Sequence, residues 1–177
     1  MNKRTICLVL TLVCALTMLA QHYNIVKNIA YTMKTDTYSA QRLKLDIYYQ
    51  EQATDLPVVV WFHGGGLTSG EKDFPYKLKE KNCVLVAVNY RLLPNVTIDQ
   101  TIDDAAEAVA WVMNHITEYG GSTKKMIVSG HSAGGYLTMM LALNKQWLER
   151  YGKDANQIAA YVPFSGQAIS HFSYRKM

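Results

Sequence analysis

The stretch MIVSGHSAGGY, residues 126–136, contains the pattern that decides the fold. It opens with the short apolar run Met126–Ser129, typical of a buried strand. Apolar side chains then recur at helical spacing from Tyr136 towards Leu148. Between the two, Gly130-His131-Ser132-Ala133-Gly134 matches the pattern G-x-S-x-G. The stretch therefore predicts a strand, a sharp turn and a helix, with Ser132 at the turn.

Such a turn strains the backbone at the serine and crowds its neighbours, which explains glycine at Gly130 and Gly134. It holds the Ser132 hydroxyl out over the sheet and directs the next N–H, that of Ala133, towards a developing oxyanion. The pattern predicts a nucleophilic serine. The alternative is a glycine-rich helix start that packs tightly on a strand.

A second motif, His63-Gly64-Gly65-Gly66, directly follows the apolar run Val58–Phe62. Glycines allow backbone N–H groups to approach an oxyanion closely and to adopt the unusual φ/ψ angles that this requires. A phosphate-binding loop is the alternative, but neither a Gly-Lys-Ser/Thr ending nor G-x-G-x-x-G is present. We expect His63 to brace this loop rather than act as a base, and His131 to pack beside the serine.

The remaining pattern predicts an α/β fold. Val84–Val88 and Ile158–Phe164 are further continuous apolar runs, typical of parallel strands buried on both faces. Ile29–Met33 and Leu43–Tyr49 precede them, and the second alternates apolar and polar residues as a half-buried antiparallel strand does. The polar segment Thr35–Gln41 between these two is expected to form a turn. The prediction is a doubly wound, mostly parallel sheet with an antiparallel N-terminal edge.

A helix is predicted from Thr101, because apolar residues recur on one face from Ile102 to Ile116. Thr101 and Asp104 resemble a capping box, and Gly120-Gly121 stops the helix. Arg91 lies at the end of a predicted strand, so an ion pair with Asp103 or Asp104 would brace that edge of the sheet. Separately solvated charges are the alternative.

Together these features resemble the α/β-hydrolase superfamily, in the branch of hormone-sensitive lipase and bacterial carboxylesterases. The likeness spans essentially everything after Ile29. It is carried by the two glycine motifs, the helix from Thr101, and the segments Asn89-Tyr90-Arg91-Leu92 and Pro163-Phe164-Ser165-Gly166-Gln167.

The resemblance implies Ser132 as nucleophile and the N–H groups of Gly65, Gly66 and Ala133 as the oxyanion hole. Gly64 is a substitute for either loop glycine. It implies no metal and no cofactor. The expected substrate is a small-molecule or carbohydrate-linked ester.

The rest of a Ser-Asp/Glu-His triad is not evident. After Ser132 the acids are Glu149 and Asp154, and the one histidine is His171. Glu149 is seventeen residues beyond Ser132, roughly 25 Å along a continuous helix at ~1.5 Å per residue. His171 follows a strand whose carboxyl end faces the Ser132 edge. It is a candidate general base, with a pocket or structural role as the alternative.

The first residues are typical of a cleaved secretion signal. Lys3 and Arg4 precede the apolar run Thr5–Leu19, and Ala20-Gln21 offers a cleavage point. The run falls short of the ~20 residues that a membrane span needs, so no stable membrane insertion is expected after cleavage. A membrane anchor is the alternative, and a lipid-modified Cys14 is a third. We expect a signal at 1–20, a secreted or periplasmic protein, and a hydrolase domain over 21–177 that is incomplete at its C-terminus.

Composition excludes several classes of function. Without Lys3 and Arg4 the chain keeps 16 basic and 14 acidic residues, which do not cluster, so nucleic-acid binding is not expected. The mature chain keeps a single cysteine, Cys83, in an apolar run, where core filling is expected. No metal-ligand spacing is present, and the oligomeric state is left open.

Two hypotheses about function remain. The first is an ester hydrolase that uses Ser132, with an amidase or formamidase of the same fold as a close variant. The second is a non-catalytic remnant or binding module of that fold, favoured by the missing acid and base. On either hypothesis we expect little or no turnover from this chain alone.

Overall fold

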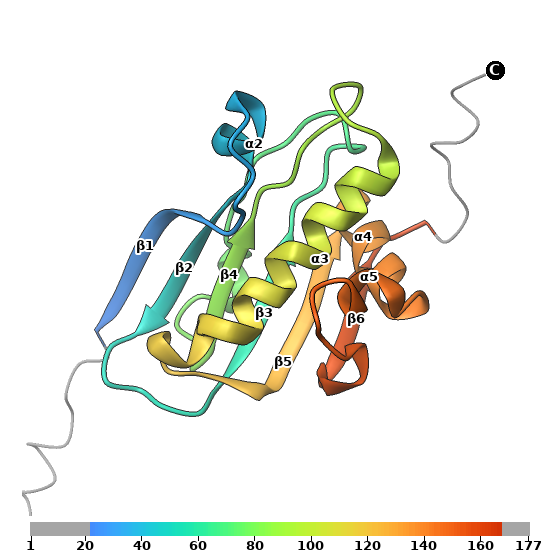
Figure 1. The fold of residues 1–177 in the computed structure, drawn as a ribbon. Coiled ribbons are helices and arrows are strands. Elements are labelled where there is room, and N and C mark those ends of the chain that lie inside the picture. Colours follow the sequence, from blue (N-terminus) through green and yellow to red (C-terminus); the bar gives the residue numbers. More distant parts are fainter. Residues whose placement is uncertain (1–21, 168–177) are drawn as a thin grey trace, which may run out of the picture.

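A computed structural model describes residues 22–167. One six-stranded sheet runs through it, in the order β1-β2-β4-β3-β5-β6 (Figure 1). The strands are β1 (Tyr23–Ala30), β2 (Lys44–Gln50), β3 (Leu56–Phe62), β4 (Val84–Val88), β5 (Gly121–His131) and β6 (Ala160–Phe164). The α-helices are α2 (Thr37–Arg42), α3 (Ile98–His115), α4 (Ala133–Leu143) and α5 (Gln146–Glu149). Short 3-10 helices are η1 (Tyr76–Leu78), η2 (Ile116–Tyr119) and η3 (Ala155–Gln157).

The centre of the sheet is parallel and its N-terminal edge is antiparallel. β3 lies between β4 and β5, parallel to both, and β6 extends the parallel part beyond β5. β2 joins β1 and β4 in antiparallel pairs. The predicted fold class, a mostly parallel α/β sheet with an antiparallel N-terminal edge, is therefore confirmed.

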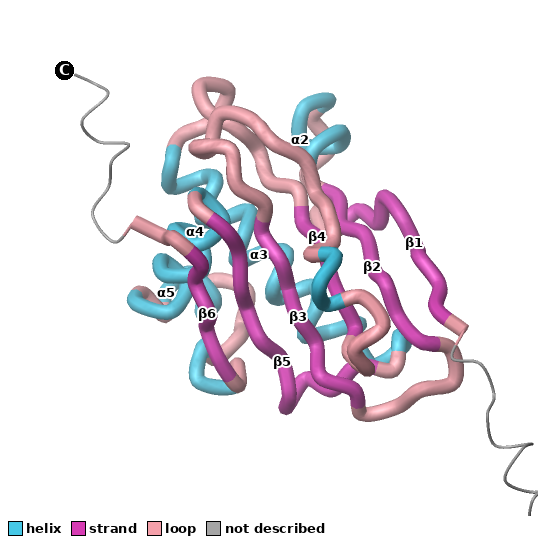
Figure 2. The backbone as a smooth tube through the Cα atoms, turned by 180° about the vertical axis from the view of Figure 1, so that it is seen from behind, coloured by secondary structure: helices cyan, strands magenta, loops and turns pink. Residues whose placement is uncertain are grey.

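The connections leave β3 and β5 in opposite directions. β3 continues to β4 on one side, whereas β5 continues to β6 on the other. Because parallel crossovers are right-handed, these connections run over opposite faces of the sheet. Figure 2, viewed from behind, shows α3, α4 and α5 beyond the sheet and the segment with η1 in front of it. The carboxyl ends of β3 and β5 thus form a topological switch point, where α/β proteins bind ligands.

The main core lies between the sheet and the helices α3 and α4 (Figure 1). Val60, Val86 and Val128 are aligned across the three central strands and are fully buried. Helix α3 buries one face against them, as its apolar spacing predicts. A smaller cluster on the other face includes Cys83, which is buried as expected.

The N-terminal edge differs from the sequence prediction in three ways. β1 begins at Tyr23, six residues earlier than the strand predicted from Ile29. The segment expected as a turn forms helix α2, whose N-cap Asp36 accepts a hydrogen bond from the Ser39 N–H. β2 is buried on both faces, not one, because Asp46 and Tyr48 are also covered.

Residues far from β2 in the sequence bury its polar positions. The alternation of apolar and polar residues therefore predicted, wrongly, that one face of β2 is exposed. Asp46 accepts from the Asn28 N–H at 2.7 Å and pairs with Lys72 at 3.1 Å. Tyr48 stacks on Tyr23 with ring centroids 5.0 Å apart.

The helix starts and ends also required correction. α3 begins at Ile98, and its capping box is formed by Thr97 and Gln100, not by Thr101 and Asp104. The predicted helix end at Gly120-Gly121 is confirmed, although a short 3-10 helix, η2, comes between α3 and Gly120. Gly120 caps η2 in the left-handed conformation. The helix after Ser132 ends at Leu143, and α5 is a separate short helix.

No helix within residues 22–167 is both long and apolar enough to cross a bilayer. The leader predicted at residues 1–20 and the candidate base His171 lie outside the described residues.

Candidate active site

Ser132 lies at the turn between β5 and α4, as the sequence predicts. Its backbone angles, φ 54° and ψ −112°, lie outside the regions that L residues ordinarily occupy. Holding a serine there costs about 1–3 kcal/mol, which the surrounding structure must offset. Two hydrogen bonds hold the turn: the Ser132 N–H donates to the Phe164 carbonyl at 2.8 Å, and the Tyr136 N–H donates to the Ser132 carbonyl at 2.9 Å. The strand β6 thus restrains the turn that carries the hydroxyl.

The glycines on either side of Ser132 allow a close approach between α4 and β3. A Cβ on Gly134 would lie 2.0 Å from the Phe62 carbonyl oxygen, and one on Gly130 would lie 2.6 Å from the same oxygen. Neither position can hold a larger residue without moving the backbone. Gly135 makes a similar contact that the sequence analysis missed, because its Cβ would lie 2.7 Å from the Phe164 oxygen.

The triple-glycine motif follows β3 and lies beside this turn. A Cβ built on Gly64 would lie 3.5 Å from the Ser132 Cβ. Gly65 and Gly66 have positive φ, 113° and 62°. The Gly65 carbonyl accepts from the Ser69 N–H at 3.0 Å, which closes the turn. The two motifs are therefore brought together at the switch point.

The backbone N–H groups expected to bind an oxyanion make no loop or turn hydrogen bond within the described part of the chain. These are the N–H groups of Gly65, Gly66 and Ala133. Glycine at these loop positions also leaves no side chain in front of the amides. The arrangement suits an anion or a carbonyl oxygen held by main-chain donors.

The buried ring of His63 packs under the glycine loop and hydrogen-bonds to its backbone. The ring stacks on Tyr90 with centroids 4.4 Å apart. Nδ1 lies 2.6 Å from the Gly64 carbonyl oxygen, which only accepts, so Nδ1 carries the proton. The Tyr90 hydroxyl donates to the His63 carbonyl at 2.8 Å. Burial lowers the pKa of His63, so the ring is neutral and structural at neutral pH.

A buried ion pair joins the segment after β4 to helix α3. Arg91 binds Asp104 through two guanidinium nitrogens, at 2.8 and 2.6 Å, and through its backbone N–H at 3.1 Å. The Asp104 side chain is fully buried. Asp103 instead accepts from the Tyr151 hydroxyl at 3.0 Å and pairs with Arg150 at 3.4 Å. The predicted ion pair is confirmed for Asp104, where it joins the first half of α3 to the segment that follows β4.

A polar network beneath the glycine loop was not predicted. Arg42 donates to the Tyr90 carbonyl at 3.2 Å and to the Gly70 carbonyl at 3.1 Å, and it pairs with Glu71. Asn89 accepts from the Lys72 N–H at 2.6 Å and donates to Glu71. Arg42 and Glu71 lie far apart in the sequence and form no local motif, so no sequence signal could have paired them.

The remaining candidates within residues 22–167 are Glu149, Asp154 and His131. Glu149 is exposed on α5, and Asp154 accepts from the Asn156 N–H at 2.8 Å at the start of η3. His131 is exposed beside Gly64. Within residues 22–167, no histidine or carboxylate hydrogen-bonds the Ser132 hydroxyl, and no three potential metal ligands gather.

Comparison with known proteins identifies relatives. The family model described as BD-FAE matches residues 45–172. A probable isoprenylcysteine alpha-carbonyl methylesterase of Oryza sativa is 30% identical over 149 residues, which cover 76% of this chain and 35% of that protein. A probable carboxylic ester hydrolase of Mycobacterium tuberculosis is 35% identical over 118 residues, covering 62% of this chain and 27% of that protein. The chain spans about a third of the length of the rice protein.

Solved structures share the fold. Esterase B from Lactobacillus rhamnosis superposes with a TM-score of 0.62 at 19% identity, over 94% of this chain and 57% of that one. Juvenile hormone esterase from Manduca sexta gives a TM-score of 0.65 at 25% identity, over 82% of this chain and 29% of that one.

Proposed function

Because this chain belongs to the BD-FAE family, among the carboxylesterase-like α/β-hydrolases, we propose that it contributes the nucleophile and oxyanion hole of a carboxylic ester hydrolase. Ser132 is the proposed nucleophile. The N–H groups of Gly65, Gly66 and Ala133 are the proposed oxyanion donors. The relatives' names support the ester as the substrate class.

One observation carries the proposal: the strained backbone of Ser132 beside the glycine loop. Strain of this kind persists only where the surroundings impose it, and it clusters at active sites. Here the strand–turn–helix, the flanking glycines and the hydrogen bond from β6 all impose it. The loop after the neighbouring strand lies beside the same serine, since a Cβ added to Gly64 would lie 3.5 Å from the Ser132 Cβ.

The proposed chemistry proceeds in two halves. The Ser132 oxygen bonds to the ester carbonyl carbon and loses its proton, and the carbonyl oxygen becomes an oxyanion held by the backbone N–H groups. The C–O bond to the alcohol then breaks, and the alcohol leaves with a proton. Water attacks the acyl-serine in the same way and releases the acid, which regenerates the hydroxyl. Neither half consumes an external oxidant or reductant.

The proposed nucleophile also needs a proton acceptor. The described histidines do not bond to the Ser132 hydroxyl, and His63 already donates to Gly64. His171 is the remaining candidate in this sequence. We accordingly propose that residues 1–177 alone turn over esters slowly, since losing a general base removes a factor of roughly 10²–10⁴.

The test is covalent labelling with a fluorophosphonate probe, followed by peptide mapping. We expect the probe on Ser132 in the wild type and no label in Ser132→Ala. Ser165→Ala is the matched control, because Ser165 is an exposed serine on the same sheet edge and should leave labelling intact. A folded wild type that takes up no probe would instead favour the non-catalytic hypothesis.

A further inference from the structure

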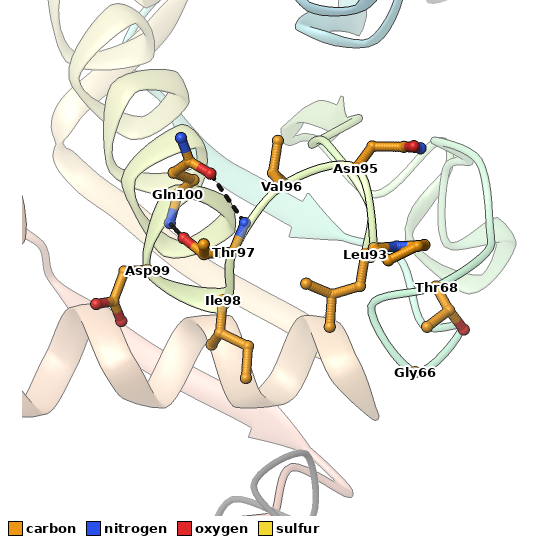
Figure 3. Close-up of a pocket in the computed structure, with 10 residues that line it drawn as sticks. Gly66, Thr68, Leu93, Asn95, Val96, Thr97, Ile98, Asp99 and Gln100 are labelled. Atoms are coloured by element: carbon orange, nitrogen blue, oxygen red, sulfur yellow. Dashed lines mark hydrogen bonds between the residues drawn. The ribbon is translucent and has the colours of Figure 1, made fainter. Parts of the chain in front are cut away.

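The glycine loop that carries the proposed oxyanion donors borders open space on one side. Gly66 and Thr68 line a cavity of about 630 Å³, whose other wall is the segment Leu93–Gln100 that leads into α3 (Figure 3). The Leu93 N–H donates to the Leu67 carbonyl at 2.8 Å and ties the two walls together. Oxyanion donors act from fixed positions, so a loop with one open side needs further restraint from elsewhere in the molecule.

His63 supplies one restraint, because its Nδ1 donates to the Gly64 carbonyl at 2.6 Å. This bond depends on where the ring lies. Within residues 22–167 the buried Nε2 atom has no hydrogen-bond partner, so the groups packed against the ring place it. Tyr90 stacks on the ring with centroids 4.4 Å apart. The backbone of Gly70 lies against its edge, since a Cβ built on Gly70 would lie 2.4 Å from Nδ1 and 2.5 Å from the Gly64 oxygen.

Arg42 joins the two segments that contact the His63 ring. From the end of helix α2, its Nε donates to the Tyr90 carbonyl at 3.2 Å and its Nη2 donates to the Gly70 carbonyl at 3.1 Å. A guanidinium holds its N–H donors in one rigid plane, so a single side chain fixes the spacing between these two carbonyls. The spacing of Gly70 and Tyr90 in turn decides where the ring can lie.

Glu71 ties the same two segments a second time. It follows Gly70 in the chain and pairs with Nη1 of Arg42. It also accepts from the side-chain amide of Asn89, the residue before Tyr90. The Arg42 guanidinium is therefore held at three of its nitrogens, each by a group next to the His63 ring or by a residue adjacent to such a group.

We propose that Arg42 is a positioning residue for ester hydrolysis: by joining Gly70 to Tyr90 it fixes the His63 ring, and thereby the Gly65 and Gly66 amides that bind the oxyanion. This inference rests on the proposed function and adds a residue from helix α2 to the groups on which the reaction rate depends. Arg42 acts through His63 and donates no hydrogen bond to the oxyanion itself.

Rates of fluorophosphonate labelling in the full chain test the proposal, because the phosphoryl oxygen of the probe takes the place of the ester carbonyl oxygen. Arg42→Lys keeps the charge but loses the planar set of donors. We expect its maximal labelling rate to fall by a factor of roughly 10–100, since a misplacement of ~1 Å can cost about 10²-fold. The probe concentration that gives half the maximal rate should not change. Arg150→Lys, at an exposed arginine paired with Asp103, is the matched control and should label like the wild type.

Glu71→Gln is the second test variant. The Glu71 side chain is 69% exposed, so this variant should fold even if Arg42→Lys does not. It removes the charge that holds the guanidinium and should lower the maximal rate in the same direction but less. Urea unfolding of each variant verifies that it is folded under the labelling conditions.

The amide resonances of Gly65 and Gly66 report the position of the loop without any chemistry at Ser132. In protein labelled with ¹⁵N-glycine, Arg42→Lys should shift both resonances, whereas Arg150→Lys should leave them in place. The Gly120 amide is the internal reference, because Gly120 precedes β5 and Ser132 follows it. A shift at Gly120 as well would indicate a general change of structure.

Two results would overturn the inference. The first is a wild-type maximal rate in folded Arg42→Lys and Glu71→Gln, whether or not the amide resonances move. The second is a lower rate with the Gly65 and Gly66 resonances unmoved, because Arg42 would then act by another route. Failure of the proposed function is distinguishable: a wild type that takes no label refutes the nucleophile, and the resonances alone then decide whether Arg42 positions the loop.

Discussion

At the residue scale, the site depends on a few positions with an unusual backbone conformation or a close contact between backbones. Ser132 adopts positive φ, and Gly134 lets the first turn of α4 contact the end of β3. The motif G-x-S-x-G predicted both features, because the reason for each glycine is local crowding around the turn. The motif could not reveal that the atom excluding a side chain at Gly134 is the Phe62 carbonyl oxygen, which belongs to another strand.

His63 makes stability depend on pH. Burial lowers the folded-state pKa of His63 below its ordinary 6.5, so below that pH the unfolded chain binds the proton more readily. Stability should therefore fall as pH drops from 6.5 towards the folded-state pKa, by at most about 1.4 kcal/mol per pH unit. Urea unfolding at pH 7.5 and 5.5 measures this. We expect a smaller pH dependence in His63→Phe, which keeps the stacking on Tyr90.

The control for His63→Phe is a substitution of a histidine that is not buried. His115 is partly exposed beside Glu118, so His115→Gln should retain the pH dependence due to His63. If wild type and His63→Phe lose the same stability between the two pH values, His63 is not held neutral by burial.

At the element scale, helix α3 carries one wall of the cavity and half of the buried ion pair. Its helical spacing was readable in the sequence, but its start was misplaced by three residues. Thr101 and Asp104 have the residue types of a capping box, yet both side chains are buried and bond to Arg91. A polar residue near a helix start can cap the helix or contact a neighbouring strand, and local sequence does not distinguish these.

The cap at Thr97 gives a testable consequence. Thr97→Ala removes the acceptor for the Gln100 N–H and should lower the free energy of unfolding by about 1 kcal/mol. Denaturant unfolding of Thr97→Ala beside Thr117→Ala, an exposed threonine beyond the end of α3, measures the difference. Equal losses in the two variants would show that the cap does not stabilise the helix start.

At the scale of the whole molecule, the sheet formed by residues 22–167 ends on β6, which is short and has exposed apolar side chains. Val162 and Phe164 are 38% and 52% exposed there. An edge strand with apolar side chains and unpaired backbone groups promotes pairing between chains. The same strand holds the Ser132 turn through the Phe164 carbonyl. Self-association through β6 would therefore occur next to the Ser132 turn.

Val162→Lys tests this property of the edge. A charge on an edge strand opposes pairing, so the variant should remain monodisperse at concentrations where the wild type associates. Light scattering over a concentration series measures the effect. Met33→Lys, at an exposed apolar residue in a loop, is the control for added charge alone. Similar association of wild type and Val162→Lys would exclude β6 as the contact surface.

The sequence by itself determined the central strands, the helix that follows each of β4 and β5, their order along the chain and the two glycine motifs, but not helix α2. These features follow from local apolar periodicity and from backbone angles that only certain residues adopt. Only the tertiary structure decided which pieces meet. It placed Gly64 beside Ser132, joined Arg42 to Glu71, and formed a cavity between two loops. Such contacts depend on β3 lying next to β5 and on the opposite faces taken by their connections, which local pattern does not encode.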